Sequence, residues 1–120
     1  MNELEKISID LNLDADSSEW GIINADADRV VEFINYYFEN EIKESFYDYL
    51  NLVFDSMNDA LLENRVNEDS IELFRKFVLD IVPKEQVFCS GAALSYWLSI
   101  NEKHQDFPVV NIVKDILGKD

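Results

Sequence analysis

The sequence predicts an all-α protein, a compact bundle of about five helices preceded by an extended arm. Apolar residues recur every three or four positions over most of the chain, as they do on the buried face of a helix. Glycine and proline are scarce, with three and two residues in 120, which argues against a turn-rich sandwich or barrel. Hydrophobic residues make up 48% of the chain, and this is enough to build a core.

The length of 120 residues is typical of one domain. We therefore expect a single helical domain over residues 1–120. An extended arm and an acidic loop occupy residues 1–25 in this prediction, and Trp20 anchors the loop to the core. The helical core covers residues 26–118.

Residues 6–14 alternate apolar and polar side chains, with Ile7, Ile9, Leu11 and Leu13 at every second position. This period is typical of a strand with one buried face. The sequence contains no second clear strand, and a single strand cannot satisfy its own backbone hydrogen-bonding groups. We expect the segment to pack as an extended arm over helices, and pairing with another chain is the alternative.

Helix boundaries follow from capping residues. Asn24 or Asp26 can cap the first helix, because their side-chain oxygens accept hydrogen bonds from first-turn N–H groups. Asn40 marks a bend after it, although one long helix is the alternative. Pro83 is expected to end the third helix, since proline disfavours helix in the residue before it. The predicted helices cover about 27–39, 41–63, 67–82, 90–100 and 107–117.

The last helix has the clearest end signals. Asp106 is a possible cap after a loop over 101–105, and Pro108 lies in the first turn, where its missing N–H costs nothing. Gly118 follows the last apolar residue and suits the left-handed conformation that often ends a helix.

The net charge is −15, from 25 acidic and 10 basic residues. Such a chain repels phosphate backbones and anionic membrane surfaces, so we expect no direct nucleic-acid or membrane binding. A basic protein would instead be attracted. Residues 1–60 carry a net −12 and residues 61–120 a net −3. Most of the excess charge therefore lies in the first half.

The sequence places the chain in the cytoplasm. Its single cysteine, Cys89, cannot form an intramolecular disulfide. The first residues are acidic and lack the apolar region of a signal peptide. The longest uncharged stretch, 86–101, has 16 residues, and a membrane span needs about 20 mostly apolar ones.

No residue pattern indicates catalysis, a metal or a cofactor. Cys89 lies at an expected helix start, which would lower the pKa of its thiol, and His104 is the only histidine that could pair with it. A free cysteine is more often a small buried hydrophobe. Zinc needs more Cys or His than the chain has. Calcium loops beginning at Asp14 or Asn24 lack the required glycine and glutamate. We expect no enzyme activity.

Five acidic residues share one face of the helix predicted over 41–63, with no lysine or arginine between them. Like charges four residues apart slightly destabilise a helix. The row is therefore either an ordinary solvated face or a surface that a basic partner covers. Nearby tyrosines could anchor such a partner: Tyr36, Tyr37, Tyr47 and Tyr49. We name as the acidic row Glu44, Asp48, Asp55, Asp59 and Glu63.

The chain resembles bacterial immunity proteins, most closely those of contact-dependent growth inhibition systems. The resemblance lies in its small size, its acidity and its helical character, and in the segment from Trp20 to Asp26 that leads into Val30–Ile34. It implies a protein that binds and neutralises a cognate toxin, a basic nuclease. The acidic row would then pair with lysines or arginines that otherwise hold nucleic-acid phosphates.

Three other functions are compatible with the sequence. A nucleic-acid mimic that inhibits a DNA- or RNA-binding complex would have the same electrostatics. A non-catalytic helical adaptor would use its acidity only for solubility. A small thiol enzyme would depend on Cys89.

Overall fold

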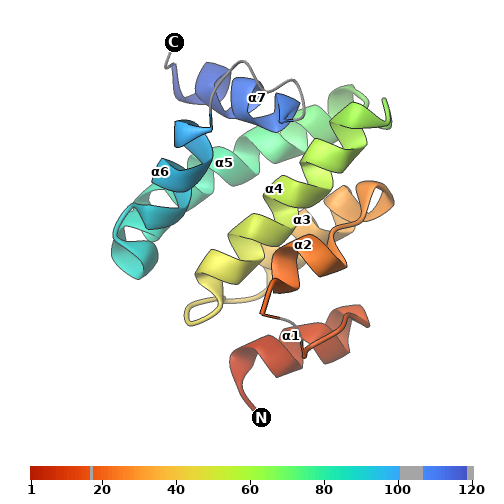
Figure 1. The fold of residues 1–120 in the computed structure, drawn as a ribbon, viewed down its shortest axis with the longest axis vertical. Helices are drawn as coiled ribbons and strands as arrows, with labels where there is room; N and C mark the ends of the chain where they lie inside the picture. The colour runs from red at the N-terminus through yellow and green to blue at the C-terminus, as the bar shows by residue number, and fades with distance from the viewer. Residues whose placement is uncertain (17, 101–106, 119–120) are drawn as a thin grey trace.

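The computed structural model describes residues 1–16, 18–100 and 107–118. Within these ranges the chain forms seven α-helices, one short 3₁₀ helix and no strand (Figure 1). The all-α bundle is confirmed, with two more helices than the five predicted. The helices are α1 (Glu3–Leu11), α2 (Trp20–Asn24), η1 (Ala27–Arg29), α3 (Val30–Glu39), α4 (Phe46–Leu62), α5 (Glu68–Cys89), α6 (Ala92–Ser99) and α7 (Pro108–Leu117).

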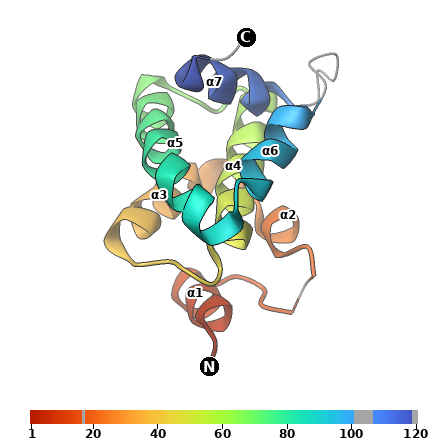
Figure 2. The same cartoon turned by 90° about the vertical axis from the view of Figure 1, so that its left-hand side faces the viewer.

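Helix α4 is the centre of the bundle. It packs against α2, α3, α5, α6 and α7, and α7 lies across one end of the bundle (Figures 1 and 2). Its apolar residues cover much more than one stripe, and Leu52, Val53, Phe54 and Met57 are all fully buried. A helix that is apolar on most of its circumference is a core helix.

The arm predicted over residues 6–14 is wrong: most of the segment belongs to α1. Ile7 and Leu11 are buried together, whereas Ile9 between them is 65% exposed. Their spacing of four residues is helical, and the alternating pattern concealed it. Asn2 caps the start of α1 by accepting a hydrogen bond from the Glu5 N–H at 2.8 Å.

Side-chain hydrogen bonds attach α1 to the rest of the bundle. The buried indole N–H of Trp20 donates to Ser8 Oγ at 2.9 Å, so Trp20 anchors its segment as predicted. The segment is not the expected loop, because Trp20 begins α2. The Glu3 carboxylate accepts hydrogen bonds from the backbone N–H groups of Lys43 and Ser45. These bonds hold the turn before α4, and α4 begins at Phe46, not near residue 41 as predicted.

The expected stop at Pro83 is also wrong, because α5 continues through it to Cys89. A proline inside a helix costs about 3 kcal/mol. Tertiary contacts beyond Pro83 offset this cost. The carboxylate of Glu85, which is fully buried, accepts hydrogen bonds from the backbone N–H groups of Ala93 and Leu94 at 2.9 and 3.2 Å and so holds the start of α6. The ring of Phe88 lies 5.4 Å from that of Phe46.

The remaining boundary predictions are confirmed where the structure describes them. Asn40 is extended and separates α3 from α4. The Asp26 side chain caps η1 by accepting a hydrogen bond from the Asp28 N–H. Pro108 begins α7 and Gly118 ends it at φ 68°. Residues 101–106, which include the predicted loop and the Asp106 cap, lie outside the described residues.

Candidate functional site

The structure brings together only the middle of the acidic row. Asp48, Asp55 and Asp59 lie on α4 and are half-buried. Glu44 is exposed in the turn before α4, and Glu63 is exposed at its C-terminal cap. The row is therefore no continuous solvated face, because its three central carboxylates are partly covered by neighbouring helices.

A groove runs over two of these carboxylates. Its volume is about 360 Å³, and α2, α4 and α6 supply most of its lining. Asp48, Asn51 and Asp55 lie one helical turn apart on the same face of α4. Trp20 lines one side, and Tyr96 with Trp97 lines the other. We call this site the acidic groove and define it by Trp20, Tyr47, Asp48, Asn51, Asp55, Tyr96 and Trp97.

Close helix packing shapes the groove. A side chain at Gly21 would place its Cβ 2.9 Å from the backbone nitrogen of Leu52, so glycine lets α2 approach α4. On the opposite wall, the indole N–H of Trp97 donates to Asn51 Oδ1 at 2.7 Å. This bond fixes α6 against α4 and fixes the Asn51 side chain between the two aspartates.

The groove penalises negative charge. Burial raises the pKa of Asp55 from 3.8 to about 7, with a further contribution from the repulsion of Asp59. Burial also raises the pKa values of Asp48 and Asp59, and Glu63 adds to the shift of Asp59. Among the described residues, none of the ion pairs of the chain involves these three aspartates. Within the described ranges, these carboxylates therefore have no ion-pair partner to stabilise their charge.

The entrance to the groove has exposed apolar and aromatic side chains. Tyr96 on α6 is 58% exposed and Tyr47 on α4 is 45% exposed. Ile22 on α2 is 62% exposed at the opposite edge. Tyrosine is enriched at protein-binding hot spots, because one end is apolar and the other forms hydrogen bonds.

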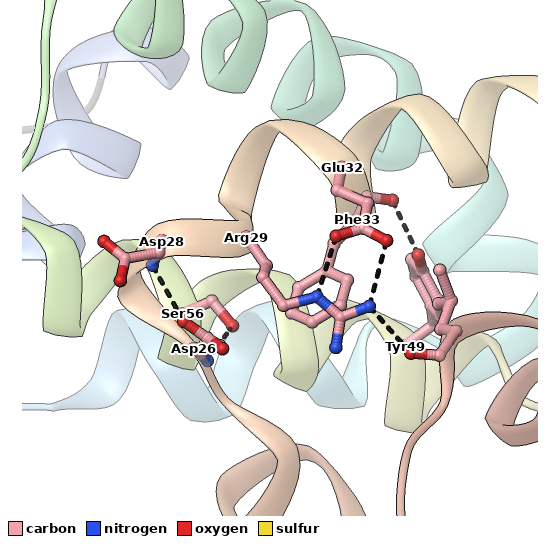
Figure 3. A network of polar contacts seen from close by, with 8 residues as sticks. Asp26, Asp28, Arg29, Glu32, Phe33, Tyr49 and Ser56 are labelled. Carbon is pink, nitrogen blue, oxygen red and sulfur yellow. Dashed lines mark hydrogen bonds and ion pairs between the residues drawn. The ribbon is translucent and has the colours of Figure 1, made fainter.

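The acidic side chains around η1 differ from those of the acidic groove, because they form hydrogen bonds within the chain (Figure 3). Arg29 donates to both carboxylate oxygens of Glu32, at 2.7 and 2.9 Å, and to the carbonyl oxygen of Leu11 at 2.7 Å. Its guanidinium also lies 4.8 Å from the ring centre of Phe33. The Arg29 hydrogen bond holds the pKa of the Glu32 carboxyl below its usual value. We call this arrangement the Arg29 network.

Three of the four tyrosines considered as anchors have structural partners. The hydroxyl groups of Tyr36 and Tyr37 donate to Asp10 and Asp80, and that of Tyr49 donates to the carbonyl oxygen of Phe33 at 2.6 Å. Of the four, only Tyr47 lines the acidic groove.

No sequence pattern indicated Tyr96, Trp97 or Ile22 as site residues. They meet Asp48 and Asp55 only because α2 and α6 pack on neighbouring faces of α4. No spacing along the chain carries that information.

Cys89 does not occupy the helix start expected from the sequence. It lies at the end of α5, not at a helix start, and burial raises its pKa, with further contributions from Glu85 and Asp48. His104 lies outside the described residues. Among the residues described, no group of three or more histidine, cysteine or acidic side chains could hold a metal ion.

In the described part of the chain, no helix has both the length and the apolar character needed to cross a membrane. Comparisons with family models, with curated proteins and with solved structures find no match to this chain.

Proposed function

We propose that the chain is an immunity protein, a stoichiometric inhibitor that binds a basic nuclease toxin in the bacterial cytoplasm. The observation that supports this most directly is the pair of half-buried carboxylates in the acidic groove, Asp48 and Asp55, which lack a cation among the described residues. A toxin that binds nucleic acid carries the lysines and arginines that such a groove would accept.

Energetics favours recognition over solubility as the role of these carboxylates. A charge used only for solubility works best fully hydrated, and partial burial weakens its hydration. A partner cation would compensate for this loss, and its own charge would then be unavailable to phosphates. A non-cognate partner without a cation at that place would leave the carboxylates unpaired, which adds specificity.

Partner capture tests the proposal. The tagged chain would be used to isolate proteins from its native host at low and high salt, with identification by mass spectrometry. We expect a basic nuclease in about a one-to-one complex at low salt and a weaker yield at high salt, since salt screens charge steering. A DNA- or RNA-binding complex in its place would indicate the nucleic-acid mimic, and self-association without salt dependence would indicate the adaptor.

A matched pair of double variants tests whether capture of the partner depends on the acidic groove. The double variant D48N/D55N removes two charges from the groove, and E68Q/E72Q removes two from exposed positions at the start of α5. We expect only D48N/D55N to lose the captured partner and to lose protection when co-expressed with it. Equal capture and protection by both variants would contradict the proposal.

A further inference from the structure

We propose that the acidic groove binds the side chain of an arginine from the partner, with its guanidinium against Asp55 and Asn51 and its stem against Tyr96 and Tyr47. This inference rests on the proposed function and specifies the chemistry of the partner residue that enters the site.

The shape of the groove fits one long side chain. Its volume of about 360 Å³ and its opening between α2 and α6 suit a side chain that enters end-on. Tyr96 and Tyr47, which are both exposed, offer apolar surface to a methylene stem, whereas Trp20 and Trp97 are almost fully buried. Asp55 and Asn51 place acceptor oxygens at the floor, where the charged end of that side chain would arrive.

The acceptors favour arginine over lysine. A guanidinium is planar and has several N–H donors in a fixed fork, so one group can bond a carboxylate and a neighbouring amide oxygen together. Asn51 Oδ1 already accepts the Trp97 N–H and still has a second lone pair. Guanidinium is also less strongly hydrated than ammonium and stacks readily on aromatic rings.

Charge complementarity identifies the occupant as a cation. The charged residues lining the groove are Glu19 at the start of α2 and the two aspartates of α4. On α4, Asp59 adds repulsion at Asp55. The α6 wall contributes Tyr96 and Trp97, and neither is a cation. No described lysine or arginine lines the groove.

A small-molecule titration tests this inference without the partner. The probe is Nα-acetyl-arginine amide, and the control is Nα-acetyl-citrulline amide, which has nearly the same shape but no charge. The reporter is the indole N–H signal of Trp97 in a ¹⁵N spectrum, because this group bonds Asn51 at the groove floor. We expect saturable shifts with the arginine probe and at least about tenfold weaker binding of the citrulline probe.

Variants and changes of pH distinguish binding of the probe at this site from general electrostatic attraction to an acidic protein. D55N should weaken binding of the arginine probe at least about tenfold, and E72Q, which removes an exposed charge from α5, should not change it. In the wild type, binding should be about tenfold weaker at pH 6 than at pH 8, since protonation of Asp55 with its pKa of about 7 removes the charge. D55N should lose this pH dependence.

Equal binding of the two probes, or equal effects of D55N and E72Q, would overturn the inference. These outcomes are distinguishable from failure of the proposed function. If the arginine probe does not bind but D48N/D55N still abolishes partner capture, the proposed function stands and only the arginine assignment fails. If the probe binds as expected but no basic partner is captured, the immunity function fails.

Discussion

The Arg29 network and the acidic groove both contain carboxylates close to α4, yet their surroundings shift the pKa of these carboxyl groups in opposite directions. In the Arg29 network, Glu32 receives two hydrogen bonds from one guanidinium, and the pKa of this carboxyl is lowered. In the groove, the pKa of Asp55 is raised to about 7 by burial. The first arrangement stabilises the folded chain, whereas the second costs stability. Such a cost is compatible with the proposed role of the groove in binding a cationic partner.

The largest effect is expected at a third carboxylate, Glu85, which is fully buried and holds the start of α6. The change Glu85→Ala should lower the free energy of unfolding by about 3 kcal/mol, because two buried N–H groups lose their acceptor. Chemical denaturation would measure it. A loss below about 1 kcal/mol would show that α6 does not depend on this cap, and the wall of the acidic groove would then have another support.

Loss of Arg29 should be the next largest effect. Arg29→Ala removes three hydrogen bonds that connect α1, α3 and η1, and we expect a destabilisation of about 2 kcal/mol. Hydrogen exchange should show α1 opening first, since its Leu11 carbonyl loses the guanidinium. Unchanged protection in α1 would mean that Ser8 and Glu3 suffice to hold this helix.

Asp55→Asn should have the opposite sign and stabilise the chain at pH 8 by about 1–2 kcal/mol, after allowance for solvent screening. The asparagine keeps the shape and removes the charge that burial penalises. Thermal melts of the wild type and the variant at pH 8 would measure the difference. A destabilised variant would show that the Asp55 charge already has a favourable partner in the free protein.

The pH dependence of stability extends this contrast. The folded chain holds the Asp55 proton up to about pH 7, whereas an aspartate with its usual pKa of 3.8 releases it near pH 4. The folded state therefore binds more protons between these values, and this contribution to stability is lost as pH rises through about 7. We expect the stabilisation by Asp55→Asn to shrink steadily from pH 8 to pH 4. A constant difference would contradict the raised pKa.

The smallest effect should come from an exposed ion pair near η1. Asp28 contacts Arg65 at 2.6 Å, and both side chains are at least half exposed. Exposed pairs contribute little because solvent screens them. Asp28→Asn should leave the melting temperature unchanged within error. A clear loss would show that the pair belongs to the Arg29 network energetically.

The sequence predicted the fold where local signals are strong. Helical periodicity and the end signals at Pro108 and Gly118 predicted α7 correctly. The predictions were wrong where tertiary packing outweighed a local sequence preference. The alternating residues of α1 fit two periods, and only burial of Ile7 and Leu11 decides between them. Helix α5 passes Pro83 because Glu85 and Phe88 pack beyond it.

The candidate site was predictable in part. Spacing alone places Asp48, Asp55 and Asp59 on one face of a helix, and the structure confirms this placement. Their half-burial could not be foreseen, because the covering walls come from α2 and α6, which are distant in sequence. The same limit explains why Tyr96 and Trp97 were missed.

The most direct test of the account is the titration of the Asp55 carboxyl group in the free protein, followed by its ¹³C side-chain signal. This carboxylate is half-buried and forms no ion pair with the part of the chain that the structure describes. We expect a midpoint of about pH 7, which falls well below that value when a cationic partner occupies the groove. A midpoint near 4 in the free protein would contradict it, since the Asp55 charge would then already be stabilised without any partner.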